Sequence, residues 1–156
     1  MVVNIIQESL MYAAYFAPRG KKRLLSLGYL LAQRHLSPLD KPIGFIGEAG
    51  AGKSILIRGM FPGLELTNDE SGINVRPLPI ITDTRRNFFS THTYHVDIRF
   101  EMAFYQLYEL ADAIKSAIQK DKRVIVEHFE LIYPFLKMNA EILIGIGEEV
   151  IVTRPN

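Results

Sequence analysis

The stretch Gly47-Glu48-Ala49-Gly50-Ala51-Gly52-Lys53-Ser54 decides how the rest of the chain is interpreted. It matches the pattern G-x-x-x-x-G-K-[ST], the phosphate-binding loop known as Walker A. Glycines let such a loop bring its backbone N–H groups close to a phosphate, with no Cβ in the way. The helix that follows adds its unpaired N–H groups and the positive end of its dipole. We therefore expect residues 47–54, together with Ile55, to bind the phosphates of a nucleotide.

The residues on either side of this loop fit the same interpretation. Residues 43–46 are a short apolar run, long enough only for a buried strand, and residues 55–58 continue as a helix. Lys53 is expected to place a full charge on the β- and γ-phosphates of ATP, and the Ser54 hydroxyl to bind Mg²⁺. The alternative is a glycine-rich turn that binds nothing.

Two carboxylates stand at the ends of strand-like runs elsewhere in the chain. Asp97 ends an alternating run just before a long helical pattern, and Glu127 ends a hydrophobic run. Ligands of open α/β sheets bind beyond the carboxyl ends of the strands, so both acids could face Ser54. We predict that Asp97 and Glu127 bind Mg²⁺ with Ser54, and that Lys53, Asp97 and Glu127 are catalytic, with Glu127 orienting the attacking water. For each acid, a helix cap or a surface ion pair is the alternative.

Two further features have both a structural and a functional interpretation. His95 is expected to be a hydrogen-bonded core histidine, but it could instead orient a water or Asp97. The Thr-rich stretch 82–86 is predicted to be irregular, and it could be a loop that responds to the γ-phosphate. A solvated pair, Arg85 and Arg86, is the alternative for that stretch.

The remaining chain alternates strand and helix patterns, which is typical of a mostly parallel sheet with flanking helices. Helices are predicted over residues 4–17, 21–35 and 99–120. Strands are predicted near residues 43–47, 63–67, 74–80, 92–98, 123–128, 140–146 and 149–153. The prediction is one α/β domain over 1–156, a three-layer P-loop NTPase, with a nucleotide-binding core at 41–156 and an N-terminal helical pair within 1–40.

Composition narrows the function classes. The 156 residues are 48% hydrophobic and 22% charged, as in a globular domain. With no cysteine, the chain has no thiolate nucleophile, disulfide, thiolate zinc site or iron–sulfur site. A net charge of +1 gives no general attraction to nucleic acid or to anionic lipid. No basic n-region opens the chain and no apolar run is long enough to span a bilayer, so we expect a cytoplasmic protein without membrane contact.

With these motifs in view, the chain resembles the small ATPase family of the bacterial tRNA threonylcarbamoyladenosine pathway. That family has a G-[DE]-x-G-A-G-K-[ST] loop followed by L-x-R-G, matched here by residues 47–54 and 56–59. Its H-x-D at a strand end is matched by residues 95–97, and its apolar strand ending in an acid is similar to residues 124–127. The resemblance covers about residues 41–153. It implies ATP and Mg²⁺ as ligands and a protein partner or tRNA-related complex.

Two other resemblances point to different functions. Residues 124–136 are similar to the strand-plus-acid segment of uridine-kinase and phosphoribulokinase-like proteins, which implies a phosphotransferase with Asp97 or Glu127 as base. The chain also resembles the N-terminal ATPase part of proteins that contain the alanyl-tRNA synthetase second additional domain, which implies a further C-terminal domain. We expect first a Mg²⁺-dependent ATPase that switches a partner, then a kinase, then a nucleotide-binding module without turnover.

Overall fold

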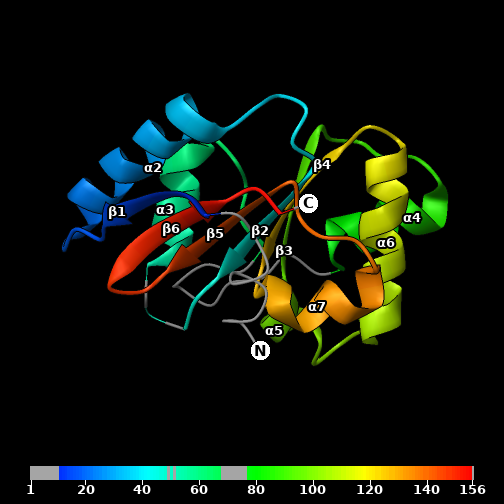
Figure 1. The fold of residues 1–156 in the computed structure, drawn as a ribbon. Helices are drawn as coiled ribbons and strands as arrows, with labels where there is room; N and C mark the ends of the chain where they lie inside the picture. Colours follow the sequence, from blue (N-terminus) through cyan, green and yellow to red (C-terminus); the bar gives the residue numbers. More distant parts are fainter. Residues whose placement is uncertain (1–10, 49, 51, 68–76, 156) are drawn as a thin grey trace.

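Residues 11–48, 50, 52–67 and 77–155 are described by a computed structural model, an α/β structure with a mixed sheet flanked by helices (Figure 1). The strands are β1 (Met11–Phe16), β2 (Pro42–Ile46), β3 (Thr93–Asp97), β4 (Arg123–Glu127), β5 (Ile142–Ile146) and β6 (Glu149–Thr153). The helices are α2 (Lys21–His35), α3 (Lys53–Met60), α4 (Pro79–Arg86), α5 (Ile98–Glu101), α6 (Leu107–Gln119) and α7 (Phe129–Leu136).

The six strands lie in the order β1-β6-β5-β2-β4-β3. β2 is parallel to both of its neighbours, β4 and β5, and β3 is parallel to β4. β6 is antiparallel to β5 and to β1, so the predicted α/β class is confirmed but the sheet is mixed. The chain runs from β2 to β3 and β4 on one side and then to β5 on the other. Ligands of open α/β sheets bind at such a switch point, beyond the carboxyl ends of the strands.

Each face of the sheet has its own core. α2 and α3 cover the face that carries Phe45 of β2 and Ile125 of β4. α4, α6 and α7 cover the other face, against Val124 and Val126 of β4. All five residues of β2 are buried, as expected for a parallel strand covered on both sides.

Two glycines allow α2 and α3 to pack very closely. A Cβ at Gly28 would collide with the carbonyl oxygen of Leu56, and a Cβ at Gly59 would collide with the carbonyl oxygen of Leu25. The Cβ position of Gly59 is also 3.1 Å from Cα of Gly28, so the two glycines meet at the helix crossing. This crossing fixes α3, and with it the loop that precedes α3.

Gly59→Ala should therefore lower the free energy of unfolding by about 1–3 kcal/mol, because the added methyl group forces the two backbones apart. Urea unfolding measures the loss. Gly147→Ala is the matched control, since a Cβ there meets nothing within 4 Å. Equal stability of the two variants would contradict the close packing of α2 on α3.

The structure corrects the N-terminal prediction. Residues 11–16, expected to end a helix over 4–17, form β1 instead, and residues 4–10 lie outside the described residues. The six residues of β1 are too few for a clear alternation of apolar and polar side chains. The strand forms by pairing with β6, from Phe16 opposite Glu149 to Met11 opposite Thr153. The helix expected over 21–35 is confirmed as α2.

Three expectations in the middle of the chain are also wrong. Residues 63–67 are not a strand, since they follow α3 as a turn and an irregular segment. The strand expected over 74–80 is contradicted at Pro79, which begins α4 in the first-turn position that suits proline, and residues 74–76 are not described. The helix expected over 99–120 is two helices, because Gln106 and Glu109 form a capping box that starts α6 afresh.

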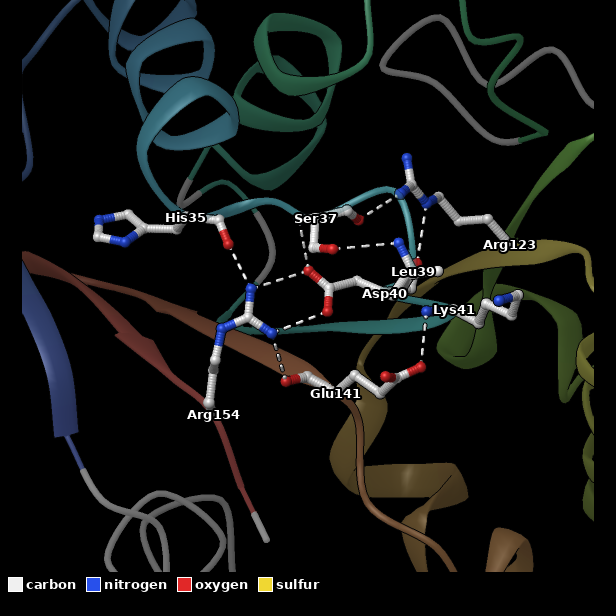
Figure 2. A network of polar contacts seen from close by, with 8 residues as sticks. All are labelled: His35, Ser37, Leu39, Asp40, Lys41, Arg123, Glu141 and Arg154. Atoms are coloured by element: carbon white, nitrogen blue, oxygen red, sulfur yellow. Dashed lines mark hydrogen bonds and ion pairs between the residues drawn. The ribbon is translucent and has the colours of Figure 1, made fainter.

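Arg154 joins the end of the sheet to the segment between α2 and β2 (Figure 2). Its guanidinium donates two hydrogen bonds to the carboxylate of Asp40, at 2.8 and 2.9 Å, and others to the carbonyl oxygens of His35 and Glu141. Burial raises the pKa of Asp40, but the hydrogen bonds from Arg154 and from the N–H of Ser37 outweigh it and hold that pKa below its ordinary value. The contact is bidentate and charge-assisted, so it fixes this edge of the fold.

Asp83 of α4 is the centre of a second buried polar cluster. Its carboxylate accepts hydrogen bonds from the hydroxyl of Tyr94 at 2.5 Å, from the hydroxyl of Ser90 at 2.8 Å and from Arg86 at 2.9 Å. Burial alone would raise the pKa of Asp83, but these hydrogen bonds outweigh burial and hold that pKa at about 2, below its ordinary value. α4 is therefore anchored to the loop before β3.

This cluster predicts a specific loss of stability in acid. A carboxyl whose pKa is lowered on folding stabilises the fold above its unfolded pKa of 3.8 and loses that contribution as the pH falls through about 2. The shift corresponds to about 2 kcal/mol. The stability gap between the wild type and Asp83→Asn, measured by urea unfolding, should narrow by about that amount between pH 6 and pH 2. A gap that stays constant over this range would contradict the assignment.

Candidate phosphate-binding site

Residues 47–52 connect the carboxyl end of β2 to α3, where glycine is required for two reasons. Gly50 and Gly52 have φ of 83° and 99°, in the left-handed region that favours glycine. Gly47 passes close to β5, since a Cβ there would lie 2.7 Å from the carbonyl oxygen of Ile146. The glycines of the motif thus allow the backbone conformation of the turn and its close approach to β5. Ala49 and Ala51 of the predicted loop lie outside the described residues.

α3 begins at Lys53, as predicted, with Gly52 as its N-cap and no side-chain cap. The first N–H groups of a helix have no partner within the helix, and Gly52, as the N-cap, has no side chain with which to cap them. Ser54 and Ile55 lie in this first turn and are half-buried. The positive end of the α3 dipole therefore faces the turn after β2.

Lys53 folds back over the turn. Its ammonium donates hydrogen bonds to the carbonyl oxygens of Gly47 at 2.7 Å and Glu48 at 2.8 Å, and the residue is only 6% exposed. Burial lowers the pKa of Lys53, and the charges of Glu127 and Asp97 oppose that shift without cancelling it. The ammonium is thus held inside the turn by two neutral oxygens, which an anion could replace.

Asp97 and Glu127 lie at the ends of adjacent strands, directly opposite each other in the register of β3 and β4. Glu127 is two residues after Ile125, so the two side chains share the face covered by α3, and Asp97 projects from the same face because it pairs with Glu127. Asp97 accepts a hydrogen bond of 3.3 Å from the N–H of Phe100, so it also caps α5, as its structural alternative predicted. Glu127 is buried. The structure therefore brings together the two acids that the sequence singled out.

His95 holds Glu127 in place. Its Nε2 is 2.6 Å from Oε2 of Glu127, and the N–H of Thr67 donates to its Nδ1 at 3.1 Å. Since Nδ1 accepts, we assign the proton to Nε2, which donates to the Glu127 carboxylate. His95 is a buried, hydrogen-bonded core histidine, as predicted. The acid that it contacts is Glu127, and the alternative named Asp97.

Glu130 is a third acid near the site, and the sequence analysis did not name it. It lies in the first turn of α7, and one carboxylate oxygen is 3.5 Å from Nδ1 of His128. Its other carboxylate oxygen, Oε1, is buried with no hydrogen-bond partner among the described residues. Its charge also raises the pKa of Lys53, against the larger effect of burial. Its closeness in the chain to Glu127, three residues earlier, is the one feature of the sequence that could have drawn attention to Glu130.

The oxygens of Ser54, Asp97 and Glu127 are hard donors of the kind that Mg²⁺ prefers. No group of three or more histidine and acidic side chains in the described residues could hold a metal ion by itself. That is compatible with Mg²⁺, which keeps several waters and is usually bound by one or two carboxylates together with substrate phosphates.

The prediction of an irregular loop over residues 82–86 is wrong, because this stretch belongs to α4. Arg86 pairs with Asp83 at 2.9 Å, and Arg85 lies 3.7 Å from a carboxylate oxygen of Glu109. Both arginines are exposed, as the solvated-pair interpretation expected. α4 packs on the sheet face opposite α3, so this stretch is not a loop over the turn.

No protein-family model matches the sequence, and a comparison with curated proteins finds no match. None of the helices in the described part of the chain combines the length and apolar character needed to cross a membrane.

Proposed function

We propose that the chain binds Mg²⁺-ATP at residues 47–55 and hydrolyses it to switch a partner. One observation carries the proposal: the motif of residues 47–54 lies at the switch point of the sheet, with the Lys53 ammonium inside the turn. Asp97 and Glu127 stand beside it at the ends of β3 and β4. The P-loop NTPase fold, ATP as the nucleotide and a tRNA-related complex as partner all belong to this proposal.

In this proposal the turn binds the polyphosphate and Lys53 neutralises part of its charge. The ammonium exchanges the carbonyl oxygens of Gly47 and Glu48 for phosphate oxygens, while N–H groups at the start of α3 point at the same anion. Ser54 and Asp97 hold the Mg²⁺, with Glu127 close by. The metal, when bound, neutralises charge on the transferring phosphoryl group.

Glu127 is proposed to orient the attacking water with its carboxylate. The hydrogen bond from His95 fixes the position of that carboxylate, and the His95 ring is itself fixed by Thr67. Asp97 is less suited to this task because it also caps α5.

A nucleoside-kinase type of phosphotransferase is the second candidate, since two carboxylates at adjacent strand ends include one that could accept a proton from a substrate hydroxyl. Kinases of this type usually carry an arginine-rich lid, and Arg85 and Arg86 of the stretch 82–86 are poorly placed to form one. Arg86 is engaged with Asp83, and α4 is anchored on the face away from the turn.

Phosphate release distinguishes the candidates. The ATPase proposal predicts release of inorganic phosphate from Mg²⁺-ATP without any acceptor, slow until a partner is present. Phosphoryl transfer to one of a panel of nucleosides, with little release to water, would favour the kinase. Binding without either reaction would leave a nucleotide-binding module. If neither ATP nor GTP binds, the proposal is wrong.

A further inference from the structure

A cavity of about 730 Å³ lies at the other end of β3 and β4 from the candidate phosphate site. It is bordered by the last turn of α3, by the segment that follows α3, and by the first residues of β3 and β4. Its volume is within the range of about 300–1,000 Å³ that is typical of small-molecule sites. The proposed ATPase reaction uses His95 and Thr67 of its lining to position Glu127, but it places no substrate in the cavity.

The walls of the cavity combine an apolar side with one cationic group. Leu36, Met60, Phe61 and Leu64 supply the apolar side, and Arg123 supplies the charge. The Arg123 guanidinium lies over the Phe61 ring, 5.7 Å from its centroid, so a flat cation and a flat ring stand together at the wall.

Arg123 forms its hydrogen bonds with neutral groups. Its Nε donates to the carbonyl oxygen of Asp40 at 2.9 Å and its Nη2 to the carbonyl oxygen of Ser37 at 2.7 Å (Figure 2). The Asp40 carboxylate is bound by Arg154 instead. Burial lowers the pKa of Arg123 against the opposing effect of the Asp40 charge, so a further anion beside the guanidinium stabilises its charged form. Of the other ionisable residues that line the cavity, His92 and Glu65 are exposed, and Tyr94 and His95 are buried.

We propose that this cavity binds a small organic anion with a flat apolar body, with the anion at Arg123, and that His95 couples it to the candidate phosphate site. His95 lines the cavity and also donates to Glu127. A ligand that shifts His95 therefore shifts Glu127, and by reciprocity nucleotide binding changes the affinity for that ligand by the same factor.

A matched pair of probes tests the ligand chemistry on the full chain. Naphthalene-2-carboxylate and naphthalene-2-carboxamide have the same body and differ in charge. In ¹H–¹⁵N NMR titrations the carboxylate should bind at least about tenfold more tightly, with the largest shifts at residues 91–95 and 61–67, since charge-assisted hydrogen bonds are roughly twice as strong as neutral ones. Equal affinities would overturn the anionic part of the proposal, and binding of neither probe would overturn the site.

Variants locate the binding. Arg123→Met should make the two probes bind equally, whereas Arg58→Met, which removes an exposed arginine of α3 outside the cavity lining, should keep the preference. Leu64→Trp should fill the cavity and abolish binding of both probes, and this half-buried position does not depend on the hydrogen bonds of Arg123. Full binding by a folded Leu64→Trp variant would place the probes elsewhere and refute the proposal.

The coupling rests on the proposed function and has its own measurement. The Kd of Mg²⁺-ATP should change at least about fivefold when the carboxylate saturates the cavity, the lower end of the range common for coupled sites. His95→Asn should remove this change. An unchanged Kd in the wild type would refute the coupling alone. Carboxylate binding without ATP binding would refute the proposed function and leave the cavity site standing, and the reverse result would refute the cavity site.

Discussion

Replacing Lys53 with alanine should remove most of the thermal stabilisation that Mg²⁺-ATP gives the protein. ATP at about 100 times its Kd stabilises a fold by about 2.7 kcal/mol. For a chain of this size that is roughly 5–10 °C in Tm. The loss is expected because the ammonium of Lys53 lies inside the turn that would hold the phosphates.

The quantity to compare is the shift in Tm on adding ATP, measured by calorimetry, and not the Tm itself. Burial lowers the pKa of Lys53, so its removal alters the stability of the free protein as well. Lys120→Ala is the matched control, because this exposed lysine follows α6, a helix on the sheet face opposite α3. The control should keep the full shift, and an unchanged shift in Lys53→Ala would mean that no nucleotide binds at this turn.

Glu127→Gln and Asp97→Asn should retain ATP binding but lower the rate of ATP hydrolysis by about 100-fold or more. Glu127 is proposed to orient the attacking water, and Asp97 to hold the Mg²⁺ that neutralises the transferring phosphoryl group. Glutamine keeps an oxygen that can accept the hydrogen bond from Nε2 of His95. Asparagine keeps the cap of α5, since Asn and Asp are equally good N-caps. The two variants therefore remove charge with little change in shape.

Turnover is measured as phosphate release under saturating ATP, with the Kd determined separately. Asp112→Asn removes a carboxylate from the exposed face of α6 and should leave both quantities unchanged. Wild-type turnover in both site variants would show that neither acid takes part in the reaction. Other groups would then carry out the hydrolysis, and the roles proposed for Asp97 and Glu127 would be wrong.

The elements that the sequence predicts well are those fixed by local signals. β2 is a wholly apolar run between Pro42 and Gly47, and α2 has its leucines at helical spacing. β1 could not be predicted in the same way, because its six residues become a strand only through pairing with β6, far along the chain. α7 was missed because only His128 separates it from β4 and because Pro134, which lies inside the helix, usually ends one.

The same division applies to the candidate site. The loop motif and the turn of α3 are contiguous, so their arrangement follows from residues 47–54 alone. The hydrogen bond between His95 and Glu127 joins two strands, and it depends on the register that pairs Asp97 with Glu127. The sequence predicts that Asp97 and Glu127 end their strands, but it does not predict which of the two acids His95 contacts.

We expect main-chain amides of residues 47–54 to bind a polyphosphate, and backbone NMR detects such binding residue by residue. When Mg²⁺-ATP is titrated into ¹⁵N-labelled protein, the amide signals of Gly50, Gly52 and Lys53 should shift more than any others and saturate with one Kd. If these three signals stay in place while ATP binds elsewhere or not at all, the account of this protein as a nucleotide-binding enzyme is wrong.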